Sequence, residues 1–332
     1  MSYRAFVGID VSKKTFDCCV LIPGRAGRYE KRFANTDTGV QHFTTWLTTH
    51  TKIDPSAWLI CMEHTGVYTL PLITGLSKAK LRFVVESPLR LKRSMGIVRM
   101  KSDKADARSI ALYAHNHQSQ LRLYRFHGQA WLKLCNLLRY REKLVKTKAQ
   151  FSTVYTELTA FTEQAVHAEV AQDSAQLIQE LELRIKRVNQ QLKQAIKQDK
   201  ALEKNFNLLL SIKGVGPITA YNMLITTRNF TAFDTPRAFA CYAGTAPFEY
   251  SSGTSIKKRN RVSQIANKHI KALLYEVAWT AVIWDPQLKA YYNRMLEKGK
   301  PKLLIINNVK NKIIARMFAV IQRQTPYVIF AH

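Results

Sequence analysis

The stretch FVGIDVSKKTFDCCVLI, residues 6–22, decides the fold of the first part of this chain. Two apolar runs, residues 6–11 and 16–22, flank the polar segment 12–14. Apolar runs separated by a short polar turn are typical of a β-hairpin. Residues 29–33 can pair with it as a third strand, so the chain is predicted to begin with a three-stranded meander.

Strands and helices alternate after this meander. The apolar spacing predicts helices over residues 37–50, 67–79 and 103–115, and strands over residues 58–62 and 81–85. Three meander strands followed by such alternation is the order found in ribonuclease-H-like folds. Residues 1–125 are therefore predicted to form an α/β domain of the RNase H-like class.

A long helical connector is predicted over residues 126–205. No glycine or proline occurs between Gly128 and Gly214, and the absence of helix breakers favours long helices. Two apolar stripes have helical spacing: Trp131, Leu134, Leu138, Val154, Tyr155 and Leu158, then Leu177, Leu181, Ile185, Val188, Leu192 and Ile196. The helices could fold back through a turn within residues 160–175 and bury both stripes, or pair with another chain as a coiled coil.

Residues 206–332 are predicted to form a mainly α C-terminal domain. Apolar residues keep helical spacing at Leu273, Val277 and Ala281, and again from Ile305 to Met317. Residues 256–332 hold 15 lysines and arginines against 3 acidic residues, a net charge of +12. This domain is therefore expected to have a basic face.

The charge of the whole chain indicates a polyanionic partner. Its 332 residues include 51 lysines and arginines against 23 aspartates and glutamates, a net charge of +28. Nucleic acid is the favoured partner because the basic residues are spread through folded-looking sequence. No apolar run approaches the roughly 18 residues of a membrane span, so no membrane partner is expected.

Cysteine usage and the N-terminus favour a cytoplasmic setting. The five cysteines lack CxxC spacing, which argues against a disulfide framework and against a cysteine-rich zinc site. The N-terminus enters the first predicted strand without the apolar core of a signal peptide. A reducing cytoplasm is the simplest location for such a chain.

Four carboxylates stand out in this basic chain. Asp10 and Glu63 lie at the ends of predicted strands, and Asp103 and Asp106 share one face of a helix start. If the four converge, their repulsion requires divalent cations, and oxygen ligands suit Mg²⁺ or Mn²⁺. A pair of such ions is a standard device for phosphodiester chemistry. The alternative is that the three aspartates are only helix-capping and turn residues.

A glycine-rich turn offers a second candidate site. Lys213, Gly214 and Gly216 lie between an apolar helix and Pro217, a pattern like a helix-hairpin-helix unit. Such a turn can present backbone N–H groups to a phosphate at a helix N-terminus. An ordinary helix end followed by a proline is the alternative.

A hydroxyl-rich segment runs into a basic cluster further along the chain. Ser251, Ser252 and Ser255 precede four cations, which are Lys257, Lys258, Arg259 and Arg261. The cations could contact phosphates from a flexible loop. A serine among them could instead attack phosphorus, with help from a base or a metal. The spacing does not choose among the three serines.

Five motifs in order make the chain resemble a known family. They are Gly8-Ile9-Asp10, Glu63-His64-Thr65-Gly66, Asp103-Lys104-Ala105-Asp106, Gly214-Val215-Gly216, and residues 242–247 followed by Ser252-Gly253. Together they resemble the DEDD-type transposases of the insertion-sequence family IS110, and the likeness covers nearly the whole chain. The relatives of this family include a site-specific invertase of pilin genes.

The resemblance implies a function and a set of partners. It implies a RuvC-like N-terminal domain, similar to Holliday-junction resolvases, whose metal ligands match Asp10, Glu63, Asp103 and Asp106. It implies a nucleophilic serine matching Ser252, a DNA substrate, a guide RNA encoded by the element, and dimers that assemble into a tetramer. It also implies a bacterial or archaeal protein associated with the nucleoid. Two departures are Ala266, where relatives often have glycine, and the unusually basic composition.

Two other functions fit the same residues. A structure-selective nuclease would keep the acidic site and use water as the nucleophile. A non-catalytic nucleic-acid-binding scaffold would need only the charge of +28. A covalent protein–DNA adduct separates a recombinase from a nuclease, and loss of strand cleavage on removal of Asp10 separates either enzyme from a scaffold.

Overall fold

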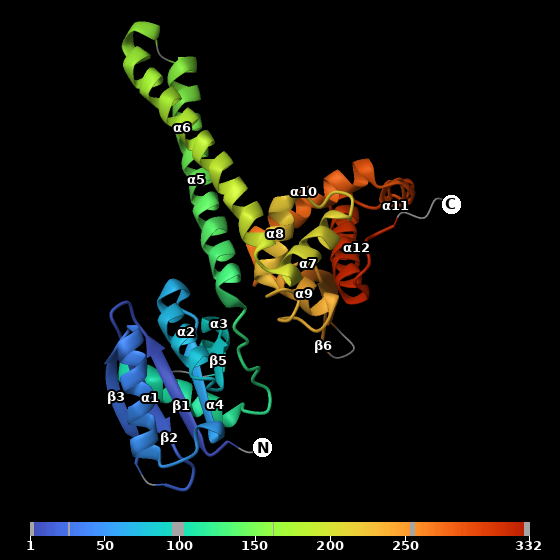
Figure 1. Ribbon diagram of the computed structural model, residues 1–332. Coiled ribbons are helices and arrows are strands. Elements are labelled where there is room, and N and C mark those ends of the chain that lie inside the picture. The colour runs from blue at the N-terminus through green and yellow to red at the C-terminus, as the bar shows by residue number, and fades with distance from the viewer. Residues whose placement is uncertain (1–2, 26, 95–102, 162, 253–255, 329–332) are drawn as a thin grey trace. The chain divides into compact units, whose positions relative to one another are not determined.

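Figure 1 shows the computed structural model of the chain, which describes residues 3–328 apart from residues 26, 95–102, 162 and 253–255. The chain forms two units, Met1–Phe126 and His127–His332. Each unit has hydrophobic clusters of its own. The predicted division of the chain into three domains stays a prediction.

A five-stranded mixed sheet forms the centre of the first unit. Its strands are β1 (Ala5–Val11), β2 (Thr15–Leu21), β3 (Tyr29–Ala34), β4 (Trp58–Glu63) and β5 (Phe83–Glu86). The order is β3-β2-β1-β4-β5, with β1, β2 and β3 antiparallel and β4 parallel to both β1 and β5. The predicted meander is confirmed, and the strand order is compatible with an RNase H-like fold.

Helices cover both faces of this sheet. On one face, α1 (Asp37–Thr51) and α2 (Leu70–Lys78) share a core with alternate residues of β1, β2 and β4. On the other face, α3 (Pro88–Ser94) and α4 (Asp103–Asn116) pack through Leu91 and Ile110 on Phe6 and Cys61.

Two details of these helices differ from the prediction. The expected helix over residues 67–79 begins with the 3-10 turn η2 (Gly66–Thr69), and α2 follows with Pro71 in its first turn, where a missing N–H donor costs nothing. The short 3-10 turn η1 (Pro55–Ala57) precedes β4, and α3 was not predicted. With only 7 residues, α3 is too short to show a clear apolar period.

The contact between α4 and β1 is a backbone contact. A Cβ atom on Gly8 would lie 2.1 Å from the carbonyl oxygen of Ala107 and 2.3 Å from the backbone nitrogen of Ala111. Both alanines are buried, and Ala107 and Ala111 also contact Cys19 of β2. Three small residues therefore let the helix lie directly on the sheet.

A long helical hairpin begins the second unit (Figure 1). Helix α5 (Gly128–Phe161) packs along α6 (Gln164–Lys197), and the turn between them falls inside the predicted range. Polar bonds join the two helices, from Arg141 Nε to Asn189 Oδ1 at 2.7 Å and from Lys148 Nζ to Glu182 Oε1 at 2.7 Å. The fold-back arrangement is therefore the one that the chain adopts.

Burial along this hairpin is uneven. Trp131, Leu134 and Leu138 are buried as predicted, because helices of the second unit pack against this end of α5. Val154, in the same predicted stripe, is 48% exposed. Among the described elements, α6 is the helix that runs along this part of α5 (Figure 1), and a single helix cannot cover a whole apolar stripe. The expectation that folding back would bury both stripes is correct from the end near Gly128 as far as the middle of the hairpin, where Leu181 is 6% exposed. It is only partly correct beyond that point.

The rest of the second unit is mainly helical, as predicted. Its elements are α7 (Lys200–Leu210), α8 (Pro217–Thr226), α9 (Pro236–Tyr242), β6 (Pro247–Ser252), β7 (Ile256–Val262), α10 (Lys268–Trp284), α11 (Pro286–Glu297) and α12 (Lys302–Arg323). A buried carboxylate links the last two helices. Asp285 accepts a hydrogen bond from Leu288 N at 2.9 Å, which caps α11, and pairs with Arg316 of α12 at 2.6 Å.

Replacing Gly8 with alanine tests the close packing of α4. The added methyl group meets backbone atoms of α4, which cannot move aside without displacing the whole helix. We expect Gly8→Ala to lower the free energy of unfolding of this unit by about 1–3 kcal/mol, as measured by urea denaturation. Lys31→Ala, at an exposed position of β3, should change it by less than about 0.5 kcal/mol. Equal stability of Gly8→Ala and the wild type would contradict the described contact.

Candidate functional site

Two of the predicted metal ligands lie at one edge of the sheet. Ile9 of β1 pairs in parallel with Met62 of β4. Asp10 and Glu63 are the next residues on these two strands, so they lie side by side. Gly8 and Cys61 face α4. Because side chains alternate between the two faces of a sheet, Asp10 and Glu63, two residues further along each strand, point to the same side. Asp10 and Glu63 therefore share the face of the sheet that α4 covers, and both are half-buried.

Helix α4 brings a third carboxylate to this edge. Burial and, to a smaller extent, the negative charge of Asp106 raise the pKa of Glu63 above its usual value. Asp106 is therefore close enough to Glu63 to disfavour a second negative charge. Asp103 is the first residue of α4, one turn before Asp106, but its side chain lies outside the described part of the structure.

The donor set at this edge fits a hard divalent cation. Asp10, Glu63 and Asp106 provide carboxylate oxygens only, the ligands that Mg²⁺ and Mn²⁺ prefer. A cation there would also relieve the repulsion between Glu63 and Asp106. Among the described residues, no three acidic, histidine or cysteine side chains form a ready-made cluster for a metal ion.

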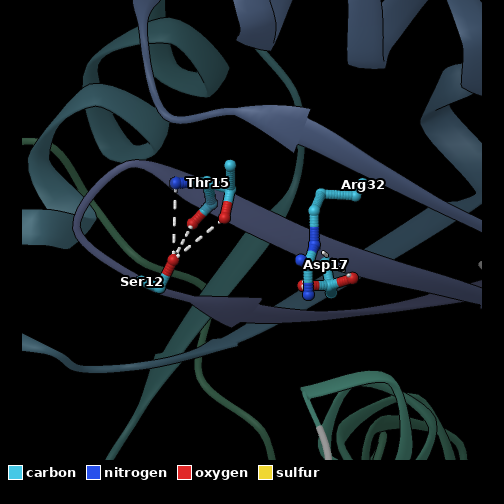
Figure 2. Close-up of polar contacts among 4 residues, drawn as sticks. All are labelled: Ser12, Thr15, Asp17 and Arg32. Carbon is cyan, nitrogen blue, oxygen red and sulfur yellow. Dashed lines mark hydrogen bonds and ion pairs between the residues drawn. The ribbon is translucent and has the colours of Figure 1, made fainter.

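The sequence analysis missed Asp17, which is paired in register with Asp10 across β1 and β2. Asp17 is 4% exposed, and Arg32 of β3 binds it through Nη2 at 2.8 Å and through Nε at 2.9 Å (Figure 2). In the turn beside it, Ser12 Oγ donates to the carbonyl oxygen of Thr15 at 2.7 Å. The arginine neutralises Asp17, so the carboxylate next to Asp10 has an ion-pair partner of its own.

Glu86 is a second acidic residue that the sequence analysis missed. It ends β5 in register with Glu63 and is 8% exposed. Its carboxylate accepts hydrogen bonds from Tyr113 Oη at 3.0 Å, Ser87 N at 2.9 Å and Arg90 Nη1 at 3.3 Å. One signal was available, because Glu86 closes an apolar strand as Glu63 does.

The candidate serine lies in a β-hairpin of the second unit. Ser252 is the last residue of β6 and pairs with Ile256 of β7, beside residues 253–255, which lie outside the described part of the chain and include the candidate Ser255. The alternative of a flexible loop is therefore wrong for residues 247–252 and 256–262, which form strands. Aromatic and β-branched residues such as Tyr250 and Val262 favour strands.

The predicted basic cluster lies on the second strand of this hairpin. Lys257 and Lys258 are in register with Ser251 and Tyr250, and Arg261 is in register with Phe248. Arg259 also belongs to β7, and Arg261 is exposed. The hairpin therefore carries the candidate nucleophile on one strand and four cations on the other.

Buried hydrogen bonds fasten the segment that leads into β6. Thr245 is fully buried, and its hydroxyl lies 3.2 Å from Asn311 Oδ1. Its carbonyl oxygen accepts from Asn307 Nδ2 at 2.9 Å and from Asn311 Nδ2 at 3.0 Å. A Cβ on the preceding Gly244 would lie 2.3 Å from the Cβ of Ala266. Ala266 therefore packs closely on the segment that leads into β6.

The predicted glycine turn joins α7 to α8. Gly214 has a φ of 91°, and a Cβ there would lie 2.8 Å from the carbonyl oxygen of Val277. Gly216 is the N-cap of α8 and has open space around it, with Pro217 in the first turn. Lys213 is exposed. Gly214 is thus required by the packing, whereas the open N-terminus of α8 is compatible with the predicted phosphate contact.

Two family models of transposases match this chain. One, described as "Transposase IS116/IS110/IS902 family", matches residues 206–293, and the IS110 DEDD model, described as "Transposase", matches residues 7–160. A third model, the helical domain of 5-hmdU DNA kinase, overlaps them over residues 114–244, which are mainly helical here. The first two together include the acidic edge and the serine hairpin.

Two similar proteins align over nearly the whole of both chains. The pilin gene-inverting proteins of Moraxella bovis and Moraxella lacunata are each 26% identical over 332 residues, which is 98% of this chain and 98% of theirs. The insertion element IS110 uncharacterized 43.6 kDa protein of Streptomyces coelicolor is 32% identical over 140 residues, 39% of this chain and 34% of that protein. No helix among the described residues is both long and apolar enough to cross a membrane.

The coupling between Glu63 and Asp106 predicts a pH effect. Because the pKa of Glu63 is raised in the folded chain, stability falls as the pH rises from the ordinary glutamate pKa through the raised one. Asp106→Asn removes one cause, so the pKa of Glu63 should fall towards its usual value in a carboxyl NMR titration. Asp37→Asn, at an exposed position of α1, should leave it unchanged. An unchanged pKa in Asp106→Asn would mean that the two groups are not neighbours.

Proposed function

This chain belongs to the IS110 family of transposases, and we propose that it excises and inserts its own mobile element by cleaving and rejoining DNA strands. One observation carries the proposal. Asp10 and Glu63 lie side by side near the carboxyl ends of neighbouring parallel strands, and Asp106 of α4 is near enough to raise the pKa of Glu63. A net charge of +28 supports a nucleic-acid substrate.

The acidic edge is the proposed metal site of an RNase H-like, RuvC-like domain. Asp10, Glu63, Asp103 and Asp106 would hold Mg²⁺ or Mn²⁺. When bound, the ion supplies Lewis-acid stabilisation of charge on phosphodiester oxygens. Arg32 and Arg90 neutralise the flanking Asp17 and Glu86, which leaves those two carboxylates to support the fold of the site.

Ser252 is the proposed nucleophile. Its Oγ forms a bond to phosphorus, the phosphoester bond to one DNA strand breaks, and the released oxygen takes up the proton that Oγ gives up. The product is a phosphoserine that conserves the energy of the phosphodiester, so a second DNA end can reverse the reaction without ATP. The cations on β7 would hold the phosphate near the hairpin.

The partners of the reaction follow from the family. We propose that an RNA encoded by the element pairs with donor and target DNA, and that dimers assemble into a tetramer. Residues Lys213, Gly214 and Gly216 would contribute a backbone phosphate contact. The corresponding location is the cytoplasm of a bacterium or an archaeon, at the nucleoid. The acidic edge and Ser252 could come from one chain or from two.

Inversion of a DNA segment is a second candidate function. The pilin gene-inverting proteins align with 98% of this chain and over 98% of their own length, so the likeness includes both the acidic edge and the serine hairpin. Inversion and transposition use the same strand chemistry and differ in how the DNA ends are arranged. Sequencing the junctions formed in a cell that carries the gene and its flanking DNA distinguishes them.

Removing the proposed metal ligands should separate binding from chemistry. Asp10→Ala, Glu63→Ala and Asp106→Ala should each reduce strand exchange to background, because the metal site is lost, while DNA affinity stays within about twofold. Electrophoresis of a labelled substrate measures cleavage, and filter binding measures affinity. The control is Asp37→Ala, an exposed acid of α1, which should retain activity. Near wild-type recombination by any of the three variants would overturn the site.

Removing the serine hydroxyl should abolish the covalent intermediate. Ser252→Ala should bind DNA normally but form no adduct on a suicide substrate, because no other group takes its place. Ser251→Ala and Ser255→Ala are the matched controls and should remain active. Peptide mapping of the shifted band identifies the linked residue. An adduct at Ser251, Ser255 or Tyr250 would overturn the assignment, and cleavage without any adduct would favour the nuclease.

A further inference from the structure

Lys310 on α12 is a buried cation. It is only 7% exposed, and no ion pair or hydrogen bond joins its side chain to a described residue. Its Nζ lies 5.0 Å from the centroid of the Tyr275 ring. Its Nζ is not among the fully buried polar atoms that lack a partner, so a ligand can reach it. Burial of the rest of the side chain still disfavours a lysine without a counter-ion, so such a lysine needs a reason.

A second lysine faces the same place. Lys271 and Tyr275 lie one turn apart on α10, so they share the face of that helix that packs on α12. Burial, and then the charge of Lys271, lower the pKa of Lys310. The two cations therefore repel each other where α10 packs on α12, and an anion there would satisfy both.

We propose that Lys310 and Lys271 form a binding site for one phosphate group of a nucleic-acid backbone. Two lysine ammonium groups without a described carboxylate partner match a phosphodiester, which carries one negative charge and two free oxygens. Lysine binds phosphate as a point charge and needs no fixed orientation of the ligand. Tyr275 covers the site from one side and holds the Lys310 ammonium in place while the anion is absent.

The position of this site gives it a role beside the serine hairpin. Asn307 lies about one helical turn before Lys310, and Asn311 is the next residue after it. Both asparagines bind Thr245, which lies two residues before the first residue of β6. The 6 residues of β6 span roughly 20 Å, so the site is at the opposite end of the strand from Ser252. A phosphate held there is not the one attacked but a neighbour that positions the strand.

Lys310→Met tests the site by two measurements. The salt dependence of binding to a short DNA duplex should lose about 0.9 from its log–log slope, or about 0.7 with a single-stranded RNA probe. The melting temperature of the free protein should rise, because methionine fills the space without a buried charge. Inorganic phosphate should raise the melting temperature of the wild type more than that of the variant.

Two further variants make the result decisive. Lys312→Met, on the same helix but exposed, should not raise the melting temperature. If Lys310→Met fails to fold, Lys271→Gln carries the same slope test. A slope reduced only with RNA identifies the guide as the source of the phosphate, and a slope reduced with DNA identifies the substrate. Unchanged slopes with both probes overturn the proposal, and since no step of catalysis is measured, they do so independently of Ser252.

Discussion

The backbone contact between α4 and β1 is the constraint on which the first unit depends. Where Gly8 meets Ala107 and Ala111, helix and strand lie closer together than any larger side chain would allow. This contact brings the first turn of α4 to the carboxyl end of β1. Asp10 and Asp106 belong to opposite ends of the unit in sequence, and without this approach their carboxylates would not face the same edge.

The same edge concentrates negative charge, and the fold manages it in two ways. Arg32 and Arg90 pair with the outer carboxylates, Asp17 and Glu86. Glu63 has a raised pKa instead, which is the response of a half-buried acid beside another acid. The flanking acids are thus neutralised, whereas Glu63 and Asp106 disfavour each other's charge. This difference supports the proposed division between structural carboxylates and metal ligands.

The second unit holds its proposed nucleophile by a different arrangement. The segment before β6 is tied to α12 through the buried Thr245, so the base of the hairpin is fixed while Ser252 lies at its other end. Basic residues follow on β7, and Lys310 and Lys271 lie near the base. If the proposals hold, one phosphate anchors the strand at the base while another reaches the serine. This arrangement would favour attack at one phosphodiester among many.

The elements of this protein could be predicted from local pattern because their hydrogen bonds and apolar periods are local. Residues 6–22 indicate a hairpin, an interval without glycine or proline indicates long helices, and Asp10 and Glu63 stand out as strand-end acids in a basic chain. Register and helix docking are different, since they depend on contacts between residues far apart in sequence. Only these contacts place Asp17 beside Asp10, expose Val154 on a two-helix hairpin, and bury Lys310 beside Lys271 without a described counter-ion.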